Sequence, residues 1–199
     1  ITVTLKKQLN IEKIVIKDKY YDKSASAEID KIVFKEGDLD FGTTVDISNL
    51  SAEFMSTTPN QNIPISLSGN LSLVGDKAYM FEIVSGLPDC FGNILKRNIE
   101  IIADSHTIEY GSAVPNLTYQ IKGDILSGDI LSGKLEVVTN GDIGEYVINL
   151  GTLGNSYYDI DFTAGTLIIT QRNITIKDVY VLDKTYDGTY HINSDNIKY

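Results

Sequence analysis

The amino-acid sequence predicts an all-β protein made of tandem small β-domains. Apolar and polar residues alternate with a period of two over many short segments, for example 117–121 and 158–162, which is the pattern of half-buried strands. β-Branched residues and tyrosine are abundant, and Gly, Asn and Asp separate the segments as turn residues do, as at Asn140-Gly141. The only plausible helical stretch is short, at residues 24–32.

The size and composition of the chain limit the functions that it can have. The chain has 199 residues, of which 42% are hydrophobic and 9% aromatic, so it can bury the cores of one large or two small domains. Its net charge is −10 and its 17 basic residues form no cluster, which excludes nucleic acid as a partner because phosphates demand clustered Lys and Arg. The single cysteine, Cys90, excludes an intrachain disulfide and a thiolate metal cage.

No apolar run reaches the length of about 18 residues that predicts a membrane span. We therefore expect no membrane insertion within this fragment. Because the sequence starts at Ile1 rather than at Met and shows no signal-peptide pattern, we expect it to derive from a longer chain.

An internal repeat divides the chain. Residues 9–22 and residues 174–187 show the same alternation of apolar and polar residues, and each ends in a Tyr-Asp pair. When Tyr21 is aligned with Tyr186, the apolar positions of the two preceding segments coincide. The repeat distance of roughly 165 residues is long for one solenoid turn and natural for a two-domain unit.

The same junction occurs at residues 96–101 and at residues 171–176, with a looser version at residues 6–11. Each junction is a strand, a short polar break and another strand with the same alternation. The last strand of one domain is therefore expected to run almost straight into the first strand of the next. Short breaks leave little freedom at the hinge, so an array of such domains becomes a semi-rigid rod.

A second internal similarity links residues 75–83 to residues 141–148, where a tight turn is followed by Tyr79 and Tyr146 respectively. In sandwich domains a tyrosine at such a corner hydrogen-bonds back to nearby backbone and holds the loop. We interpret these tyrosines as structural residues.

The second half of the chain resembles a known family. Four blocks in order resemble the MBG domain of the YGX type, which is found in bacterial surface proteins, and they lie at residues 108–119, 127–133, 140–146 and 165–170. The similarity covers residues 99–172. It implies a tandem array on a cell-surface or secreted adhesin-like protein, without catalytic activity. For modules of about 75 residues we favour an immunoglobulin-like sandwich, with a β-grasp-like sheet as the alternative.

The flanking modules resemble the YDG domain that often alternates with the MBG domain. Its motif is present as Tyr186-Asp187-Gly188 and, less faithfully, as Tyr21-Asp22-Lys23, where Lys23 replaces the expected glycine. The sequence thus predicts a YDG-like β-domain at residues 1–97, an MBG-like β-domain at 98–172 and the truncated start of a second YDG-like repeat at 173–199. We expect this last part to be disordered or paired into another sheet.

The sequence contains few residues that are candidates for catalysis or metal binding. His106 and His191 have no metal-ligand spacing, and Cys90 has no histidine nearby in sequence to activate it. The acidic loops at residues 36–40 and 123–129 contain oxygen ligands of the kind that Ca²⁺ takes, but match no calcium-loop pattern. We therefore expect that the protein is not an enzyme, and we assign no catalytic, cofactor-binding or metal-binding residue.

The sequence favours a non-catalytic repeat region of a bacterial cell-surface or secreted adhesin-like protein, acting as a semi-rigid stalk or spacer in an extracellular or cell-surface location. Neighbouring repeats of the same chain are the expected partners. The alternative is direct binding of a host glycan or matrix protein by exposed tyrosines, with Tyr186, Tyr190 and Tyr199 as candidates. A third hypothesis is homotypic association through unpaired edge strands.

Overall fold

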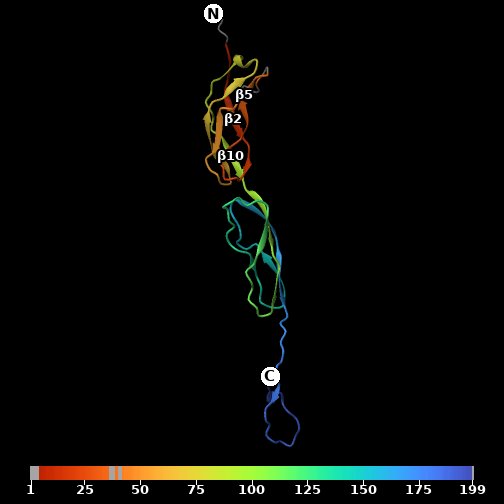
Figure 1. Ribbon diagram of the computed structural model, residues 1–199. Coiled ribbons are helices and arrows are strands. Elements are labelled where there is room, and N and C mark those ends of the chain that lie inside the picture. The colour runs from red at the N-terminus through yellow and green to blue at the C-terminus, as the bar shows by residue number, and fades with distance from the viewer. Residues whose placement is uncertain (1–4, 36–38, 40–41, 199) are drawn as a thin grey trace.

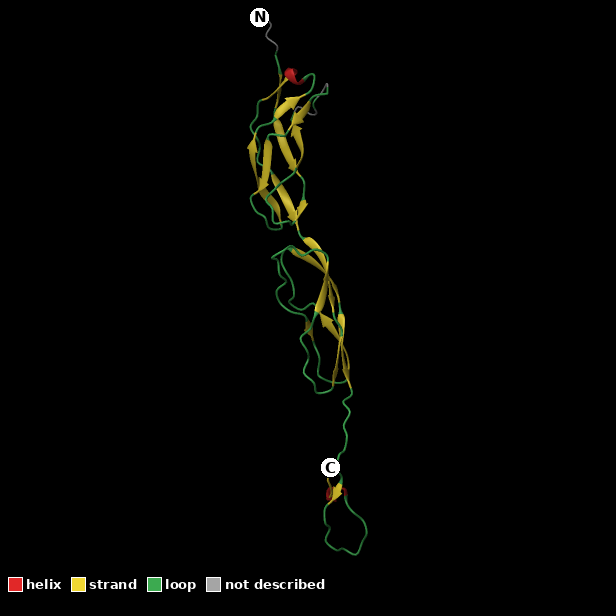
Figure 2. Cartoon of the chain, viewed as in Figure 1, coloured by secondary structure: helices red, strands yellow, loops and turns green. Residues whose placement is uncertain are grey.

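The computed structural model describes residues 5–35, 39 and 42–198 and consists of strands joined by turns (Figure 2). The 3-10 turns η1 (Ala78–Met80) and η2 (Ser194–Asn196) are the only helical elements within these ranges. The predicted all-β class with tandem β-domains is therefore confirmed. Figure 1 shows two β-domains arranged end to end, followed by a thin C-terminal segment. Neither helical turn of the described ranges has the length and apolarity that a membrane crossing requires.

The first domain extends to Leu95. Its main sheet has the strand order β3-β10-β7-β6, and three two-stranded pairs, β1-β9, β2-β4 and β5-β8, complete it. The strands are β1 (Lys7–Leu9), β2 (Ile11–Ile16), β3 (Lys19–Tyr20), β4 (Ile29–Phe34), β5 (Thr44–Asp46), β6 (Leu50–Phe54), β7 (Asn60–Gly69), β8 (Ser72–Val74), β9 (Phe81–Ile83) and β10 (Phe91–Leu95).

The expectation of a helix at residues 24–32 was wrong. Strand β4 occupies Ile29–Phe34 and pairs antiparallel with β2, with Ile14 opposite Ile32. The β-branched residues of β4 fit a pleated, half-buried surface. Their pairing with a strand that is already part of the core outweighs a weak local preference for helix.

The second domain runs from Arg97 to Thr170. One sheet has the strand order β13-β11-β16 and the other has the order β12-β17-β15-β14. The strands are β11 (Arg97–Ala103), β12 (His106–Glu109), β13 (Tyr119–Lys122), β14 (Glu136–Val137), β15 (Gly144–Asn149), β16 (Tyr158–Thr163) and β17 (Gly165–Thr170).

The two sheets of the second domain bury one core between them. Ile101 of the first sheet and Ile148 and Leu167 of the second are fully buried. Along β11 and β17, buried residues alternate with half-buried ones, so the period of two that the sequence predicted is present. No α-helix covers a sheet within the described residues. Two sheets that share one core form a sandwich arrangement, which is the fold the sequence favoured.

Two neighbouring strands of this sandwich change sheets together. β11 and β16 run parallel from Arg97 opposite Tyr158, and β12 and β17 continue the same parallel register from His106 opposite Leu167. At the corner a Cβ atom on Gly165 would lie 2.8 Å from the backbone carbonyl oxygen of Ala103, so the close crossing requires glycine. These parallel pairs distinguish the domain from a purely antiparallel sandwich.

The predicted hydrogen bond from a tyrosine back to its own turn is present in the second domain only. The Tyr146 hydroxyl donates to the Asp142 carbonyl oxygen at 2.9 Å, so this tyrosine does hold its turn. Tyr79 lies in η1, is 61% exposed and has no hydroxyl hydrogen bond among the described residues. The prediction was wrong for Tyr79 because the chain forms a 3-10 turn there before β9 begins, so the tyrosine does not open the strand.

The C-terminal segment, residues 171–198, forms a hairpin of its own. β18 (Tyr180–Val181) pairs antiparallel with β19 (Ile197–Lys198), which resembles the antiparallel pairing of β2 with β4 in a different register. We expected disorder or pairing into another sheet, and the local antiparallel pairing instead satisfies backbone groups within the segment. The predicted divisions at 97/98 and 172/173 remain predictions.

Candidate functional site at the domain junction

The two domains are joined by a single residue. β10 ends at Leu95 and β11 begins at Arg97, so only Lys96 separates the last strand of the first domain from the first strand of the second. The Lys96 ammonium pairs with Asp159 at 3.4 Å, and the Arg97 amide donates to the Tyr157 carbonyl oxygen at 3.2 Å. The strand-to-strand junction expected from residues 96–101 is present in the structure.

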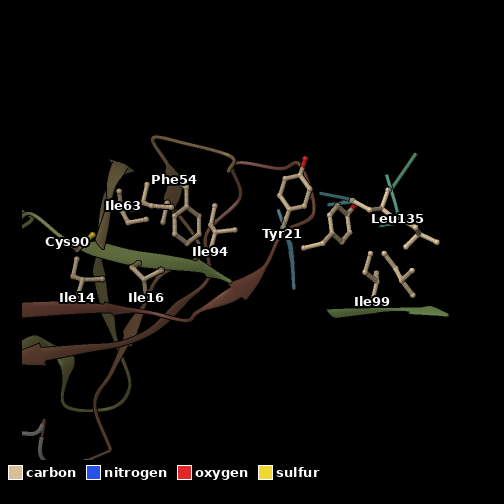
Figure 3. Close-up of a cluster of buried hydrophobic side chains, with 14 of the residues drawn as sticks. Ile14, Ile16, Tyr21, Phe54, Ile63, Cys90, Ile94, Ile99 and Leu135 are labelled. Atoms are coloured by element: carbon tan, nitrogen blue, oxygen red, sulfur yellow. The ribbon is translucent and has the colours of Figure 1, made fainter. Parts of the chain in front are cut away.

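Tyr21 bridges the two domains. Its amide donates to the Leu95 carbonyl oxygen at 2.8 Å, and its ring lies 4.9 Å from the ring of Tyr157 and 6.1 Å, edge to face, from that of Tyr158. Figure 3 shows Tyr21 between the core of the first domain, where Ile94 lies, and the side chains of the second domain. Only 4% of Tyr21 is exposed, although it belongs to a turn.

The environment of Tyr21 is apolar enough to affect its ionisation. Burial raises the pKa of the Tyr21 hydroxyl, and the negative charge of Asp129 raises it further. The neutral tyrosine is therefore the form that fits between the two domains. Aromatic pairs of this geometry contribute about 0.5–1.5 kcal/mol beyond the burial of their area.

An ion pair and hydrogen bonds surround the tyrosines. The Lys23 ammonium lies 2.8 Å from a carboxylate oxygen of Asp129 and also donates to the Ser127 carbonyl oxygen. The other carboxylate oxygen of Asp129 accepts a hydrogen bond of 2.7 Å from the Tyr158 hydroxyl. That hydroxyl in turn accepts the Leu126 amide at 3.0 Å. The loop at residues 123–129 is thus held against the first domain.

Arg97 supports the junction from the strand that connects the domains. Its Nη1 donates to the Tyr21 carbonyl oxygen at 3.3 Å, and its Nη2 lies 3.8 Å from Asp124. The guanidinium therefore contacts both the turn of the first domain and the loop of the second. A planar group with several fixed donors suits such a bridging position.

The turn that carries Tyr21 has a polar network of its own, centred on Lys19. The Lys19 ammonium donates to Asp22 Oδ1, to Ser24 Oγ and to the Ser24 carbonyl oxygen, each at 2.8 Å, and to the Ser26 carbonyl oxygen at 3.1 Å. Lys23, the residue at the position of the expected glycine, has a φ of +67°. It therefore keeps the left-handed conformation that glycine would supply, while its ammonium reaches Asp129.

The sequence-predicted candidate residues lie in separate parts of the structure. In the part of the chain that the structure describes, no group of three or more His, Cys, Asp or Glu side chains is placed to hold a metal ion. His106 lies on β12 and His191 in the C-terminal hairpin. Of the loop at residues 36–40, only Leu39 lies among the described residues, and the loop at 123–129 uses its acids at the junction.

Sequence reasoning missed the residues that build the junction. Tyr157, Tyr158 and Asp129 are far from Tyr21 in sequence, and nothing in the local pattern links them. One available signal was the presence of two adjacent tyrosines at residues 20–21 and again at 157–158. Another was Lys23 at the position where the repeat has Gly188, because a side chain is uncommon at a position that favours glycine.

The junction is expected to weaken in acid. The Lys23 ammonium and the Tyr158 hydroxyl hydrogen-bond to the carboxylate and hold the pKa of Asp129 below its usual range. A lowered folded-state pKa means that this stabilisation is present above the unfolded pKa of about 3.9 and is lost as pH falls through the folded value. Asp129→Asn should therefore be less stable than the original chain at pH 7.

Chemical denaturation of both chains over a pH series would check this expectation. The two curves should converge in acid, where Asp129 is protonated. A constant difference at every pH would show that the carboxylate charge does not stabilise the junction. Asp142→Asn is a matched control, because Asp142 lies in the exposed turn at residues 139–142 and away from Lys23.

Cys90 is expected to be inert. Its side chain is buried in the core of the first domain, and burial raises the pKa of the thiol. Since the thiolate is the reactive form, a thiol reagent should modify Cys90 only after denaturant is added. Mass spectrometry at neutral pH would measure the modified fraction, and rapid modification of the native protein would contradict the burial.

The fold and the junction together define a protein of tandem β-domains joined strand to strand, with a bridging aromatic turn. Within it, residues 99–168 match the family model of the MBG domain (YGX type). The second domain is therefore MBG-like, as the resemblance over residues 99–172 predicted. No curated protein and no solved structure matches the chain. The YDG-like character of the flanking modules stays a prediction.

Proposed function

We propose that the chain is a non-catalytic, semi-rigid stalk or spacer in a bacterial cell-surface or secreted adhesin-like protein. The observation that carries this proposal is the junction, where Tyr21 packs on the rings of Tyr157 and Tyr158 across a one-residue connection. Such a joint opposes bending between domains. The MBG-like second domain supports a place among surface-protein repeats.

The spread of contacts around the junction also supports a mechanical role. Tyr21 packs on Tyr157 and Tyr158 at the start of β16. Lys96 pairs with Asp159, and Arg97 pairs with Asp124 of a different segment. Bending at Lys96 would have to break ion pairs or separate buried rings. Individual exposed ion pairs contribute about 0–1 kcal/mol, so the buried tyrosines carry most of the resistance.

Tandem chains that contain one, two and three copies of the repeat would test the proposal. A semi-rigid rod predicts that the maximum dimension from small-angle X-ray scattering grows in proportion to copy number. A flexible chain of beads grows only as the square root of that number. Square-root growth would contradict the stalk, and electron microscopy of the same chains would show whether the domains lie in line.

A groove beside the junction favours a second candidate function, direct binding of a glycan. The groove has a volume of about 500 Å³, and its wall includes Tyr20, Asn60, Gln61, Asn98 and Asp159. Tyr20 is 60% exposed and presents a ring face, while the amides and the carboxylate provide donors and acceptors for sugar hydroxyls. Tyr186 and Tyr190 are exposed in the C-terminal segment, and Tyr199 lies outside the described residues.

A glycan and matrix-protein panel would separate the two functions. Saturable binding that is lost in Tyr20→Ala would support the adhesive function of the groove. Tyr79→Ala is the matched control, because Tyr79 is 61% exposed and belongs to η1, the helical turn at the end of the first domain that faces away from the junction (Figure 2). Binding that survives Tyr20→Ala would exclude this groove.

A further inference from the structure

The C-terminal turn at residues 184–189 repeats the hydrogen bonds of the turn that carries Tyr21. The Lys184 ammonium donates to Asp187 Oδ1 at 2.7 Å, to Thr189 Oγ1 at 2.8 Å, to the Thr189 carbonyl oxygen at 3.2 Å and to the His191 carbonyl oxygen at 2.7 Å. In both turns the acceptors lie three, five and seven residues after the lysine. The two turns therefore share one polar framework.

The backbone of the two turns also agrees. Asp187 Oδ1 accepts the Thr189 amide at 2.9 Å, as Asp22 Oδ1 accepts the Ser24 amide at 2.8 Å. Gly188 has a φ of +75°, close to the +67° of Lys23. Because the framework fixes the backbone on both sides of the tyrosine, each turn presents its ring from the same position.

The surroundings of the two tyrosines differ completely. Tyr21 is 4% exposed and Tyr186 is 92% exposed. The same ring is therefore buried by a receptor surface in one turn and bare in the other. Within the described residues nothing packs on Tyr186, whereas the equivalent turn has a complete receptor in the second domain.

We propose that the 184–189 turn docks on a second MBG-like domain, a copy of the one at residues 97–170, by inserting Tyr186 against a tyrosine pair equivalent to Tyr157 and Tyr158. The receptor surface combines two aromatic rings with the Asp129 carboxylate at one side. The same turn on the same receptor surface is already present once in the chain. The C-terminal segment thus carries a connector for a further junction.

This inference goes beyond the stalk proposal, because it concerns a turn that takes no part in the junction at Tyr21. It also predicts a difference between the two junctions. Gly188 stands where Lys23 supplies an ammonium to Asp129, so docking of Tyr186 lacks that ion pair. We expect the Tyr186 junction to depend on salt less than the Tyr21 junction does.

The experiment uses the full chain followed by a second copy of residues 35–172, which continues the repeat in the alignment of Tyr21 with Tyr186. Hydroxyl-radical footprinting with mass spectrometry reports the exposure of individual tyrosine side chains. We expect Tyr186 to become protected by roughly tenfold, to the level of Tyr21, as burial of an aromatic ring removes its accessible surface. An unchanged modification rate at Tyr186, with Tyr21 protected, would overturn the inference and leave the stalk proposal intact.

A folding control accompanies this measurement. Both copies of Cys90 must resist a thiol reagent, which shows that the appended residues have folded. Gly188→Lys in the extended chain then restores the missing ammonium, and protection of Tyr186 should become as sensitive to salt as protection of Tyr21. If Gly188→Lys leaves the salt dependence of Tyr186 protection unchanged, the proposed equivalence of the two receptor surfaces is contradicted.

If the appended copy does not fold, association between whole chains decides the question. Tyr21→Ala vacates the receptor surface near Tyr157, so the Tyr186 turn of one molecule can occupy that surface on another. We expect concentration-dependent association of this variant in sedimentation velocity, and its loss in the Tyr21→Ala, Tyr186→Ala double variant. A Tyr21→Ala chain that stays monomeric at millimolar concentration would overturn the inference.

Discussion

Tyr21→Ala is expected to lower the free energy of unfolding of the chain by about 3 kcal/mol, because replacing a large buried aromatic by alanine costs about 3–5 kcal/mol when a cavity remains. The cavity would lie between the domains, where the Tyr21 ring meets those of Tyr157 and Tyr158. The relative orientation of the domains should therefore become variable. Chemical denaturation would measure the stability, and small-angle scattering would detect a broader distribution of distances.

Two further variants make this prediction specific. Tyr186→Ala changes the equivalent residue of the C-terminal turn, which is 92% exposed, and should alter stability by no more than about 0.5 kcal/mol. Tyr21→Phe keeps the ring and should preserve the straight arrangement of the domains. If Tyr21→Ala left the scattering profile unchanged, Tyr21 would not be the element that fixes the junction.

Gly133→Ala is expected to be the most damaging single glycine substitution in the second domain. Gly133 has a φ of +86°, and an added Cβ atom would lie 2.1 Å from the Thr152 carbonyl oxygen. The backbone cannot move away, because Ser132 and Gly154 exchange two hydrogen bonds of 2.8 Å on one side and the Thr152 amide donates to Lys134 at 3.0 Å on the other.

Two effects of Gly133→Ala lower the stability of the folded chain, namely backbone strain and overpacking. The left-handed conformation costs a residue with a side chain about 1–2 kcal/mol, and overpacking costs about 1–3 kcal/mol more. Gly141→Ala separates them, because Gly141 has a φ of +85° and nothing within 4 Å of the added atom. Urea denaturation should show a loss at Gly133 at least about 1 kcal/mol larger than at Gly141. Equal losses would mean that the backbone near Thr152 relaxes freely.

Much of the architecture was predictable because it depends on local pattern. Alternation along β11 places Ile99, Ile101 and Ala103 in the core, and this follows from the geometry of a strand. The polar break at Lys96 marks the junction in the same way. By contrast, residues 24–32 have an ambiguous local pattern, and only pairing with β2 decides that residues 29–32 enter strand β4.

The junction could not be predicted from the sequence in the same manner. In the sequence, Tyr21 is one of several tyrosines next to turn residues. Its burial depends on residues of another domain, which the local pattern does not show. In the sequence, the loop at residues 123–129 is an acidic loop with oxygen ligands of the kind that Ca²⁺ takes, yet in the structure Asp129 faces Lys23 and Tyr158. Both assignments require knowledge of which surfaces meet, and local periodicity does not contain that information.

By itself the sequence determined the all-β class, a strand-to-strand junction within the polar break at residues 96–98 and the repetition of the turns that carry Tyr21 and Tyr186, because each is encoded in the order and spacing of neighbouring residues. Only the tertiary structure decided that one tyrosine is buried at a domain junction and the other exposed. The physical reason is that burial depends on packing between segments distant in the chain, and identical turns present their rings identically whether or not a receptor surface lies opposite.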